Sequence, residues 1–410
     1  MQFEENLKKY AELVISMGVN LQKGQQMVLR TPIECADFAR LLAETAYQHG
    51  AKEVIIQWKD EQFAKIKYTY SPLEVFETMP RWQADFNNSY AESGACFVTI
   101  AADDPELLAG VDPAKLIAGA KASHAACKPF YDRIDSGELV WNIISVPTAA
   151  WAKKVFPNCS KERAMEQLWN AIFKAVRVDT PDPVAAWARH RDSFQAKKDF
   201  LNGKQFCTLH YTNSLGTDLT IGMPDHHIWE GGGDVAQNGV EFFPNMPTEE
   251  VFCAPHRNKV NGKVVASMPL NHNGNLITNF SFTFRNGEIV DYSAETGAEI
   301  LEHILKTDDG SRRLGEVALV PSRSPISDMK ILFYNTLFDE NASCHLAIGS
   351  AYQSCVQGGL RMSKEELLQI GLNDSVNHID FMIGTEDLKI VGTDADGKET
   401  IVFEEGNWAF

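Results

Sequence analysis

The sequence predicts an α/β protein in two parts, an N-terminal α/β layered domain (residues 1–200) and a mixed α+β C-terminal domain (residues 201–410). Three observations support this prediction. A chain of 410 residues is too long for one ordinary core, and a hydrophobic content of 44% is sufficient for two. Long helical patterns alternate with apolar strand patterns in the first half, whereas short strands and turns dominate the second half.

The first half opens with a strand–helix–strand pattern. An amphipathic helix is expected at residues 4–17, a strand at 26–30, a helix at 34–49 that ends at Gly50, and an apolar strand at 53–58. This spacing predicts a βαβ unit, whose crossover is nearly always right-handed. The rest of the first half is expected to add two strands and three helices, at residues 95–101 and 139–145 and at residues 116–130, 161–176 and 183–202.

The glycine pattern does not predict a nucleotide site. No GxGxxG motif follows a strand, and no Walker-type loop is present in the sequence. Gly231, Gly232 and Gly233 follow no convincing strand pattern and open no helix, so we expect them to form a flexible loop. The first half is therefore interpreted as a scaffold or an assembly surface.

A proline-rich stretch separates the two halves. Thr180-Pro-Asp-Pro183 interrupts regular structure, and the helix after it is expected to lead into the second domain, so we place the boundary near residue 200. Beyond it, Arg285-Asn286-Gly287-Glu288 is a strong hairpin signal. Three further segments alternate as strands do, at residues 207–212, 218–221 and 279–285.

Charge and cysteine usage restrict the partners and the compartment. The formal net charge is −17, and so acidic a surface repels phosphate backbones, which argues against nucleic acid as a partner. No apolar run approaches the roughly 18–20 residues of a membrane-spanning helix, and residues 1–10 lack a signal-peptide core. The eight cysteines form no CxxC pair, a pattern typical of reduced, buried thiols. We therefore expect a cytoplasmic protein that binds neither nucleic acid nor membrane.

The last third of the chain contains six side chains that could bind metals. Four are carboxylates and two are imidazoles, namely Glu250, Glu316, Glu340, Asp380, His345 and His378. This mixture suits two divalent ions such as zinc, cobalt or manganese better than calcium, which prefers oxygen ligands alone. If the six side chains converge, the expected chemistry is hydrolysis by a water activated between two metals.

The clearest local pattern is His378-Ile379-Asp380. In a strand, side chains two residues apart share one face, so His378 and Asp380 would point the same way as Met382. Ile379 and Phe381 would point the other way, into a core. The alternative is an edge strand whose polar face is merely solvated.

Two glutamates precede or open apolar strands. Glu249 and Glu250 are adjacent, so only one can face the metals, and the pattern alone does not select between them. If Glu250 is the ligand, Cys253 points away from the site. Glu316 opens the apolar run that ends at Val320, which suggests a paired or metal-bound charge, although a surface glutamate at a strand start is equally compatible.

A helix is expected to begin near Ala342, with Asn341 as its N-cap. His345 would then lie in the first turn, and Tyr352, almost two turns later, would share its face. Glu340 fits the turn before the cap, from where it could reach the same metal. The alternative is a helix with a solvated glutamate and a hydrogen-bonded core histidine.

Four longer motifs surround these residues. They are Asn245-Met-Pro-Thr-Glu-Glu-Val-Phe252 with Ala254-Pro-His256, Leu314-Gly-Glu-Val-Ala-Leu-Val320, Phe333-Tyr-Asn-Thr-Leu-Phe-Asp-Glu-Asn341 with His345 and Tyr352, and Asn377-His-Ile-Asp-Phe-Met-Ile-Gly384. Together they resemble the aminopeptidase T / aminopeptidase S (PepS) family of dinuclear metallo-aminopeptidases. The match covers the whole second half, and the order of helices and strands in the first half agrees with it.

The resemblance implies a metal-dependent aminopeptidase that removes N-terminal residues from peptides. It implies that the six side chains bind two metals in a C-terminal catalytic domain. It selects Glu250 over Glu249, suggests Glu316 as the bridging carboxylate, and makes Tyr352 a catalytic side chain near the metals. It also implies a cytoplasmic homodimer.

Tyr352 would act as a neutral donor to the oxyanion that develops during peptide hydrolysis. One alternative is a two-metal hydrolase of another substrate class, such as a phosphoesterase, because Arg257, Lys259 and Lys263 follow Glu250 and phosphate chemistry recruits basic side chains. The second alternative is a non-enzymatic α/β binding protein whose carboxylates form a solvated face.

Overall fold

The computed structural model describes residues 2–272 and 274–410. The chain folds into two compact units, Met1–Arg189 with Gly233–Pro247, and His190–Gly232 with Thr248–Phe410. The predicted domains, 1–200 and 201–410, differ from these units in two respects. The first long segment ends at residue 189, within a helix, and residues 233–247 return to the first unit.

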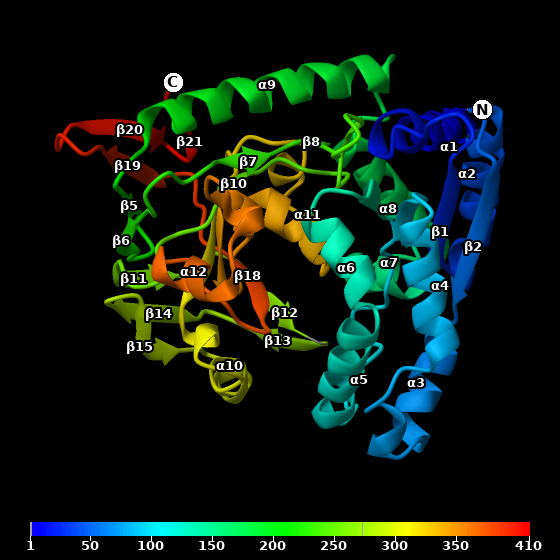
Figure 1. The fold of residues 1–410 in the computed structure, drawn as a ribbon, viewed down its shortest axis with the longest axis horizontal. Coiled ribbons are helices and arrows are strands. Elements are labelled where there is room, and N and C mark those ends of the chain that lie inside the picture. The colour runs from blue at the N-terminus through cyan, green and yellow to red at the C-terminus, as the bar shows by residue number, and fades with distance from the viewer. Residues whose placement is uncertain (1, 273) are drawn as a thin grey trace. The chain divides into compact units, whose positions relative to one another are not determined.

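The first unit contains a parallel four-stranded sheet in the order β2-β1-β3-β4 (Figure 1). Its strands are β1 (Gln26–Pro32), β2 (Glu53–Lys59), β3 (Cys96–Ile100) and β4 (Trp141–Ile144). β1 and β2 pair in parallel from Gln26 opposite Glu53 to Pro32 opposite Lys59, with α2 between them in the chain. The predicted βαβ unit is therefore confirmed.

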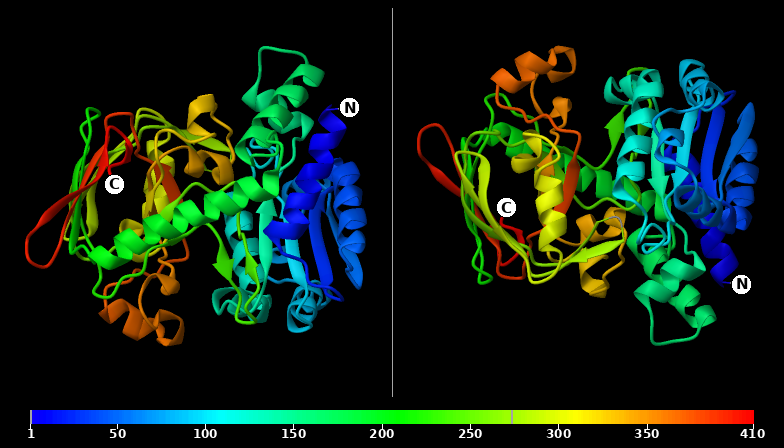
Figure 2. Two further views of the ribbon diagram at one scale, coloured as in Figure 1. Left: turned by 90° about the horizontal axis from the view of Figure 1, so that it is seen from above. Right: turned by 90° about the horizontal axis from the view of Figure 1, so that it is seen from below.

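Helices lie on both sides of this sheet (Figure 2). On one side, Phe97 of β3 packs edge-on against Phe130 of α6. On the other, Tyr10 of α1 contacts Phe38 of α2 and Phe173 of α8. The helices in this part of the chain are α1 (Gln2–Leu13), α2 (Ala36–Gln48), α3 (Glu61–Tyr70), α4 (Arg81–Glu92), α5 (Pro113–Ala126), α6 (Lys128–Asp135), α7 (Ala149–Val155), α8 (Lys161–Ala175) and α9 (Pro183–Lys204).

The helices differ from the sequence predictions in two ways, because one predicted helix is divided and α3, α4 and α7 were not predicted. The single helix expected at 116–130 is two helices, α5 and α6, which separate at Cys127. Pro129 lies in the first turn of α6, where its missing N–H is tolerated, but it cannot continue α5. α3 was not predicted; Glu61 is its one buried residue, and its apolar side chains Phe63, Ile66 and Tyr70, which have helical spacing, are exposed.

The second unit contains two antiparallel sheets. The larger has the order β15-β14-β11-β6-β5-β19-β20-β21 and the smaller the order β18-β17-β16-β10-β7. The larger is formed by β5 (Thr208–Thr212), β6 (Asp218–Gly222), β11 (Val260–Val265), β14 (Ser281–Arg285), β15 (Glu288–Ser293), β19 (Lys389–Thr393), β20 (Glu399–Glu404) and β21 (Asn407–Trp408). The smaller is formed by β7 (Glu230–Gly231), β10 (Val251–Cys253), β16 (Leu314–Leu319), β17 (His345–Gly349) and β18 (His378–Met382).

Side chains from both sheets form one apolar core. Tyr211 and Phe282 of the larger sheet are buried in the same cluster as Val317, Leu346 and Phe381 of the smaller sheet.

The unit also contains three short helices and a two-stranded ribbon, and a second such ribbon belongs to the first unit. These are α10 (Ala298–Leu305), α11 (Thr336–Asp339), α12 (Lys364–Gln369), β12 (Leu270–His272) with β13 (Asn275–Ile277), and β8 (Asp234–Val235) with β9 (Glu241–Phe242). Among the described residues, no helix has both the length and the apolar character needed to cross a bilayer.

The turn between β14 and β15 confirms the predicted hairpin. Asn286 and Gly287 both have positive φ, 50° and 81°, as the preferred two-residue hairpin turns require. A β-carbon on Gly287 would lie 1.8 Å from the carbonyl oxygen of Arg257, so a side chain is excluded there.

The prediction of a flexible loop at the glycine triplet is wrong for its first residue. Gly231 pairs with Val251 in the five-stranded sheet, and Glu230 pairs with Phe252. A β-carbon on Gly231 would lie 2.3 Å from the carbonyl oxygen of Glu250. The glycine therefore permits a close backbone approach that the sequence pattern did not reveal.

Candidate metal centre

Strand register brings the candidate ligands onto one face of the five-stranded sheet. Glu316 of β16 pairs with Ala347 of β17, which pairs with Asp380 of β18. Because directly paired residues share a face, Glu316 and Asp380 point the same way. His345 pairs with Ala318, two residues along β16 from Glu316, and so lies on the same face.

The opposite face of the same strands is apolar. Val317, Leu346 and Phe381 alternate with the candidate ligands and are almost completely buried in the core of the unit. His378 and Asp380 therefore share one face, as predicted, while Phe381 faces the core. The pairing of these strands positions the ionisable side chains, because a register slip of one residue would bury the charges and expose the core.

Small residues separate the candidate ligands on their face of the sheet. Ala347 lies between Glu316 and Asp380, and Ala318 lies beside His345. A methyl group at each of these positions leaves room above the sheet between the longer ionisable side chains. The short side chains at these positions therefore do not project between the ionisable groups.

The distances define two overlapping groups that share Glu316. His345 Nε2 lies 3.1 Å from an oxygen of Glu250 and 3.5 Å from Oε1 of Glu316. His378 Nε2 lies 3.3 Å from Oε2 of Glu316 and 3.5 Å from Asp380. Within each group the ligand-type atoms lie within 4.8 Å of one another, a spacing at which they could hold a cation. Each oxygen of Glu316 thus faces a different histidine.

Backbone carbonyls orient both imidazoles. His345 Nδ1 lies 3.2 Å from the carbonyl oxygen of Ser343, and His378 Nδ1 lies 2.8 Å from that of Ser350. An Nδ1–H that donates to a carbonyl leaves Nε2 free to face the centre, which is the usual arrangement for a metal-binding histidine. The donor set therefore fits divalent cations in its orientation as well as in its composition.

The buried carboxylates differ in their protonation. Burial alone would raise the pKa of Glu316, but the hydrogen bonds from His345 and His378 outweigh it and lower this pKa to about 2. Burial raises the pKa of Glu250, despite its hydrogen bond with His345. Burial would lower the pKa of both histidines, but their carboxylate partners raise it well above the usual value. A cluster of buried carboxyl groups favours the binding of positive charge, which divalent cations would supply.

Glu340 lies at the end of α11, in the 3₁₀ turn Glu340–Ala342. Burial, followed by the charges of Glu250 and Asp380, raises the pKa of Glu340 well above its usual range. Its carboxylate is thus close enough to interact with those acids. It is not among the residues of the two groups defined above.

The helix expected to begin near Ala342 does not form, and this prediction is wrong. Residues 345–349 are β17, a strand paired on both sides. Two flanking strands outweigh the local helical pattern, because pairing satisfies every backbone group of a buried segment. Gly349, with φ of 114°, ends the strand where a β-carbon would lie 2.1 Å from the carbonyl oxygen of Asn377.

Asn341 has a different role from the predicted helix cap. Its side chain is completely buried, its Oδ1 accepts a hydrogen bond from the N–H of Glu249 at 2.6 Å, and its Nδ2 donates to the carbonyl of Leu337 at 2.9 Å. It therefore joins the segment that carries Glu250 to the turn that carries Glu340. Sequence reasoning missed this contact because the two segments are 92 residues apart.

Glu249 points toward another partner. Its carboxylate lies 3.6 Å from Nε2 of His190, whose ring nitrogen also lies 2.8 Å from the carbonyl oxygen of Thr248. Cys253 lies in the buried core with the residues of the apolar face. Glu250, not Glu249, is thus the acid that meets His345.

Tyr352 follows β17 in a loop, so it is not on a helical face shared with His345. Its ring nevertheless lies next to the centre, with centroids 5.2 Å from His378 and 5.5 Å from Phe252. The loop is held by Glu230, whose carboxylate accepts a hydrogen bond from Ser354 at 2.8 Å. The side chain is half exposed, which leaves it accessible to a ligand.

The phenol of Tyr352 keeps its proton at neutral pH. Although half of the side chain is exposed, loss of water around its hydroxyl, followed by the charges of Glu316 and Asp380, raises the pKa of Tyr352 well above its usual value. The side chain can therefore donate a hydrogen bond beside the acidic centre.

Two of the three basic residues behind the phosphoesterase alternative belong to the other sheet of the unit. Lys263 is in β11 of the eight-stranded sheet, where it pairs with Asp218, and Lys259 directly precedes that strand. The candidate ligands lie on the five-stranded sheet. The sequence proximity of these lysines to Glu250 therefore does not correspond to a shared site.

Comparisons with known proteins identify the family of this chain. The family model described as thermophilic metalloprotease (M29) matches residues 3–408. Aminopeptidase AmpS of Bacillus subtilis (strain 168) is 48% identical over 100% of this chain and 99% of its own length, and aminopeptidase T of Thermus thermophilus is 41% identical over 99% of each. The solved structure of wild-type AmpT from Thermus thermophilus matches with a TM-score of 0.93 and 39% identity over 100% of both chains.

The family resemblance stated from the motifs is therefore confirmed, as is the α/β fold class. The match extends over both halves of the chain, including the first half, in which the sequence analysis identified no catalytic motif. The chain belongs to the M29 family of metalloproteases.

Proposed function

We propose that this metallo-aminopeptidase removes N-terminal residues from peptides by means of a water shared between two divalent cations. The observation that carries the proposal is the position of Glu316, whose two oxygens face two different histidines at 3.5 and 3.3 Å. One carboxylate between two imidazole-containing groups is the arrangement expected of a bridging ligand.

The proposed ligands divide between the two cations. Glu250, Glu316 and His345 would hold one, and Glu316, His378 and Asp380 the other. Glu340, whose carboxylate interacts with Glu250, would complete the first set. Zinc, cobalt and manganese all suit this mixture of oxygen and nitrogen donors. When bound, the cations would supply Lewis acidity and lower the pKa of a shared water toward about 7.

The protein's own side chains would orient the substrate and stabilise developing charge. Tyr352 carries a protonated phenol beside His378, and it would donate a hydrogen bond to the carbonyl oxygen of the first peptide bond as that oxygen becomes negative. The acidic side chains around the centre favour the free α-amine of a peptide. Recognition of that amine would restrict cleavage to the first residue.

The compartment and the assembly belong to the same proposal. All eight cysteines are free and six of them are buried, which supports a reducing compartment such as the cytoplasm. A homodimer is proposed from the family resemblance alone. Sedimentation equilibrium of the purified protein would test it, with a monomer mass as the contradicting result.

The decisive experiment is metal-stripped enzyme restored with one ion at a time. We expect zinc, cobalt or manganese to restore hydrolysis of aminoacyl-nitroanilides, with saturation at two ions per chain. Nitrophenyl phosphate serves as the control for the phosphoesterase alternative and should not be hydrolysed. Activity in the stripped enzyme, or saturation at one ion, would contradict the proposal.

A further inference from the structure

The edge strand β7 contributes an acidic side chain to the face that carries the candidate ligands. Glu230 of β7 pairs with Phe252 of β10, and Phe252 pairs with Ala318 of β16. Ala318 in turn pairs with His345 of β17. Because directly paired residues share a face, Glu230 lies on the same face of the sheet as His345.

Glu230 is separated from the candidate ligands along this face. Three strand spacings of about 4.8 Å lie between its backbone and that of His345. It belongs to neither of the two groups that share Glu316. Its carboxylate instead meets the loop after β17, where Ser354 Oγ donates a hydrogen bond to Oε2 of Glu230 at 2.8 Å. The route from Glu230 to the centre therefore runs through this loop.

The loop contains a tight turn that joins Ser354 to Tyr352. Tyr352 directly precedes the 3₁₀ turn Gln353–Cys355, and the N–H of Cys355 donates to the carbonyl of Tyr352 at 3.2 Å. Ser354 is the middle residue of this turn. Because a hydrogen-bonded turn has little internal freedom, a displacement of Ser354 also displaces Tyr352.

The side chains of two paired strand residues contact this turn. The ring of Phe252 lies against that of Tyr352, with centroids 5.5 Å apart. Glu230, the partner of Phe252 in the sheet, holds Ser354. The Tyr352 ring also lies 5.2 Å from that of His378. The pairing of β7 with β10 thus links Glu230 to the place where the phenol meets a candidate ligand.

Backbone hydrogen bonds hold both ends of the loop whatever the side chain at position 230. The N–H of Ala351 donates to the carbonyl of Asn373 at 3.0 Å, and the N–H of Ile228 donates to the carbonyl of Cys355 at 2.7 Å. Loss of the bond between the side chains of Ser354 and Glu230 should therefore change the orientation of the turn more than the fold of the loop.

The proposed role of Tyr352 needs a well-defined position of its hydroxyl. Half of its side chain is exposed, so packing alone does not fix the ring. A donor acts on an oxyanion over only about 2.7–3.1 Å, and a displacement of about 1 Å can lower a rate by about 10²-fold. The bond from Ser354 to Glu230 supplies a constraint on the turn that packing does not.

We propose that Glu230 is a positioning residue for Tyr352, whose phenol it directs toward the centre through the hydroxyl of Ser354. The inference rests on the proposed function, in which Tyr352 is the oxyanion donor. Glu230 itself does not touch the substrate in this arrangement. Its contribution is to restrict the turn, so that the phenol is in place before charge develops.

Two substitutions remove the bond and two conservative ones keep it. Ser354→Ala removes the donor, and Glu230→Ala removes the acceptor. Ser354→Thr retains a hydroxyl, and Glu230→Gln retains a side-chain oxygen that can accept the bond without a charge. The measurements on the metal-loaded full chain are kcat and KM for leucyl-nitroanilide, metal content, and melting temperature.

We expect each alanine variant to lower kcat by about 10- to 100-fold, the size typical of a group that orients another, with KM and metal content unchanged. Ser354→Thr and Glu230→Gln should keep most of the wild-type kcat. A wild-type kcat in both alanine variants would overturn the inference. A loss in Glu230→Gln as large as that in Glu230→Ala would also overturn it, because charge would then matter and not the hydrogen bond.

The Tyr352→Phe background separates positioning from a general structural role. Once the phenol is absent, Ser354→Ala has nothing left to position, so Tyr352→Phe/Ser354→Ala should be no slower than Tyr352→Phe alone. A further loss of kcat of the same size would overturn the inference. An unchanged kcat in Tyr352→Phe would overturn the role of Tyr352 and the inference with it. A metal-loaded wild type that hydrolyses no aminoacyl-nitroanilide would instead overturn the proposed function as a whole.

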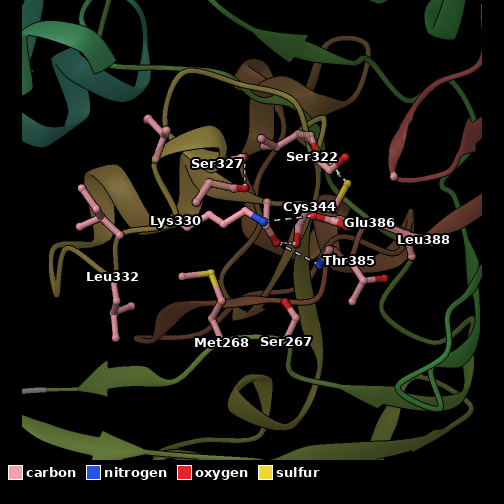
Figure 3. Close-up of a pocket in the computed structure, with 17 residues that line it drawn as sticks. Ser267, Met268, Ser322, Ser327, Lys330, Leu332, Cys344, Thr385, Glu386 and Leu388 are labelled. Carbon is pink, nitrogen blue, oxygen red and sulfur yellow. Dashed lines mark hydrogen bonds and ion pairs between the residues drawn. The ribbon is translucent and has the colours of Figure 1, made fainter. Parts of the chain in front are cut away.

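Ser322→Ala is the matched control. Ser322 is also a half-buried serine, and its hydroxyl accepts a hydrogen bond from Nδ2 of Asn407 at 3.0 Å. It lines a cavity of about 460 Å³ (Figure 3), whose described lining includes neither a candidate ligand nor Tyr352 or Glu230. This variant should lose about as much stability as Ser354→Ala but keep the wild-type kcat. An equal loss of kcat in both variants would overturn the inference.

A binding measurement reports on the phenol without turnover. The phosphonic acid analogue of leucine presents tetrahedral oxygens where the oxyanion would develop, whereas leucinol does not. Calorimetry should show that Ser354→Ala weakens binding of the phosphonic acid by at least about 10-fold and leaves binding of leucinol unchanged. Equal affinity of the phosphonic acid for the wild type and Ser354→Ala, or equal weakening of both ligands, would overturn the inference.

Discussion

Two buried glutamates, one in each compact unit, have pKa values displaced in opposite directions. Glu61 in the first unit has its pKa raised to about 8 by burial and then by a hydrogen bond with Asp103 and the charge of that acid. Glu316 in the second unit has its pKa lowered to about 2, because two imidazoles outweigh its burial. Both residues are buried, so the neighbouring groups decide whether the pKa rises or falls. An acid beside an acid retains a proton, whereas an acid between imidazoles stays charged and available to a cation.

The largest effect is expected from Glu316→Gln, which removes the charge that both imidazoles share. Loss of an outer-shell partner lowers metal affinity by about 10- to 100-fold, and loss of the proposed bridging ligand should lower it by more than about 100-fold for both ions. Calorimetric titration and metal analysis after dialysis measure the change. Glu299→Gln, at an exposed site on α10, is the control. Two ions bound to Glu316→Gln with wild-type affinity would disprove the bridging role.

Tyr352→Phe tests the proposed oxyanion donor, a phenol that keeps its proton beside the charged centre. Removing one oxyanion donor typically lowers kcat by about 10²- to 10³-fold. We expect a loss of this size with two ions still bound per chain. Steady-state kinetics of the metal-replete variant gives the answer, and an unchanged kcat would remove Tyr352 from the mechanism.

Asn341→Ala tests whether the link between the segments of Glu250 and Glu340 supports the centre. We expect metal affinity to fall by about 10- to 100-fold, the size typical of an outer-shell partner. Asn142→Ala is the matched control in the first unit, because Asn142 is equally buried and donates a hydrogen bond to the carbonyl of Phe243 at 2.7 Å. Both variants should lose stability, by about 1–3 kcal/mol, but the control should bind metal normally. Equal metal affinity in the two variants would contradict the proposed link.

The smallest effect is expected from Glu61→Gln. The folded-state pKa of Glu61, about 8, exceeds the value of about 4.3 for an exposed glutamate, so folding favours its protonated form. The associated stability is complete below about pH 4 and is lost as the pH rises to 8. Glu61→Gln should therefore match the wild type near pH 4 and exceed its stability by about 1–3 kcal/mol at pH 8.

Denaturant unfolding at several pH values measures this difference. Glu77→Gln, at an exposed position, is the control and should follow the wild type. Aminopeptidase activity should not change. A stability difference that does not vary with pH would show that Glu61 is not protonated in the folded protein.

Local sequence patterns predicted the βαβ unit of the first unit well because its elements are consecutive in the chain. β1, α2 and β2 follow one another in the chain, and their periodicities of two and 3.6 are visible within short windows. The prediction was wrong where one residue decides, as at Pro129, and it omitted α3, α4 and α7. The apolar side chains of α3 are exposed, so its packing does not follow from its sequence pattern.

The candidate centre depends on pairings between segments far apart in the chain. The shared face of His378 and Asp380 was predictable because a strand alternates its side chains. The strand at His345 was not, since its neighbours in the sheet are β16 and β18 and local sequence favoured a helix. The choice of Glu250 over Glu249 needed the family resemblance, because adjacent acids are equivalent until the partners His345 and His190 are known.

The two-residue strand β7 has a consequence for the behaviour of the protein in solution. It pairs with β10 beside Glu250, and Gly231 allows it to approach closely enough to do so. The strand that directly follows Glu250 is thereby kept away from the open edge of its sheet. An edge strand of only two residues offers few unpaired backbone groups to a strand of another chain, so it protects against edge-to-edge aggregation.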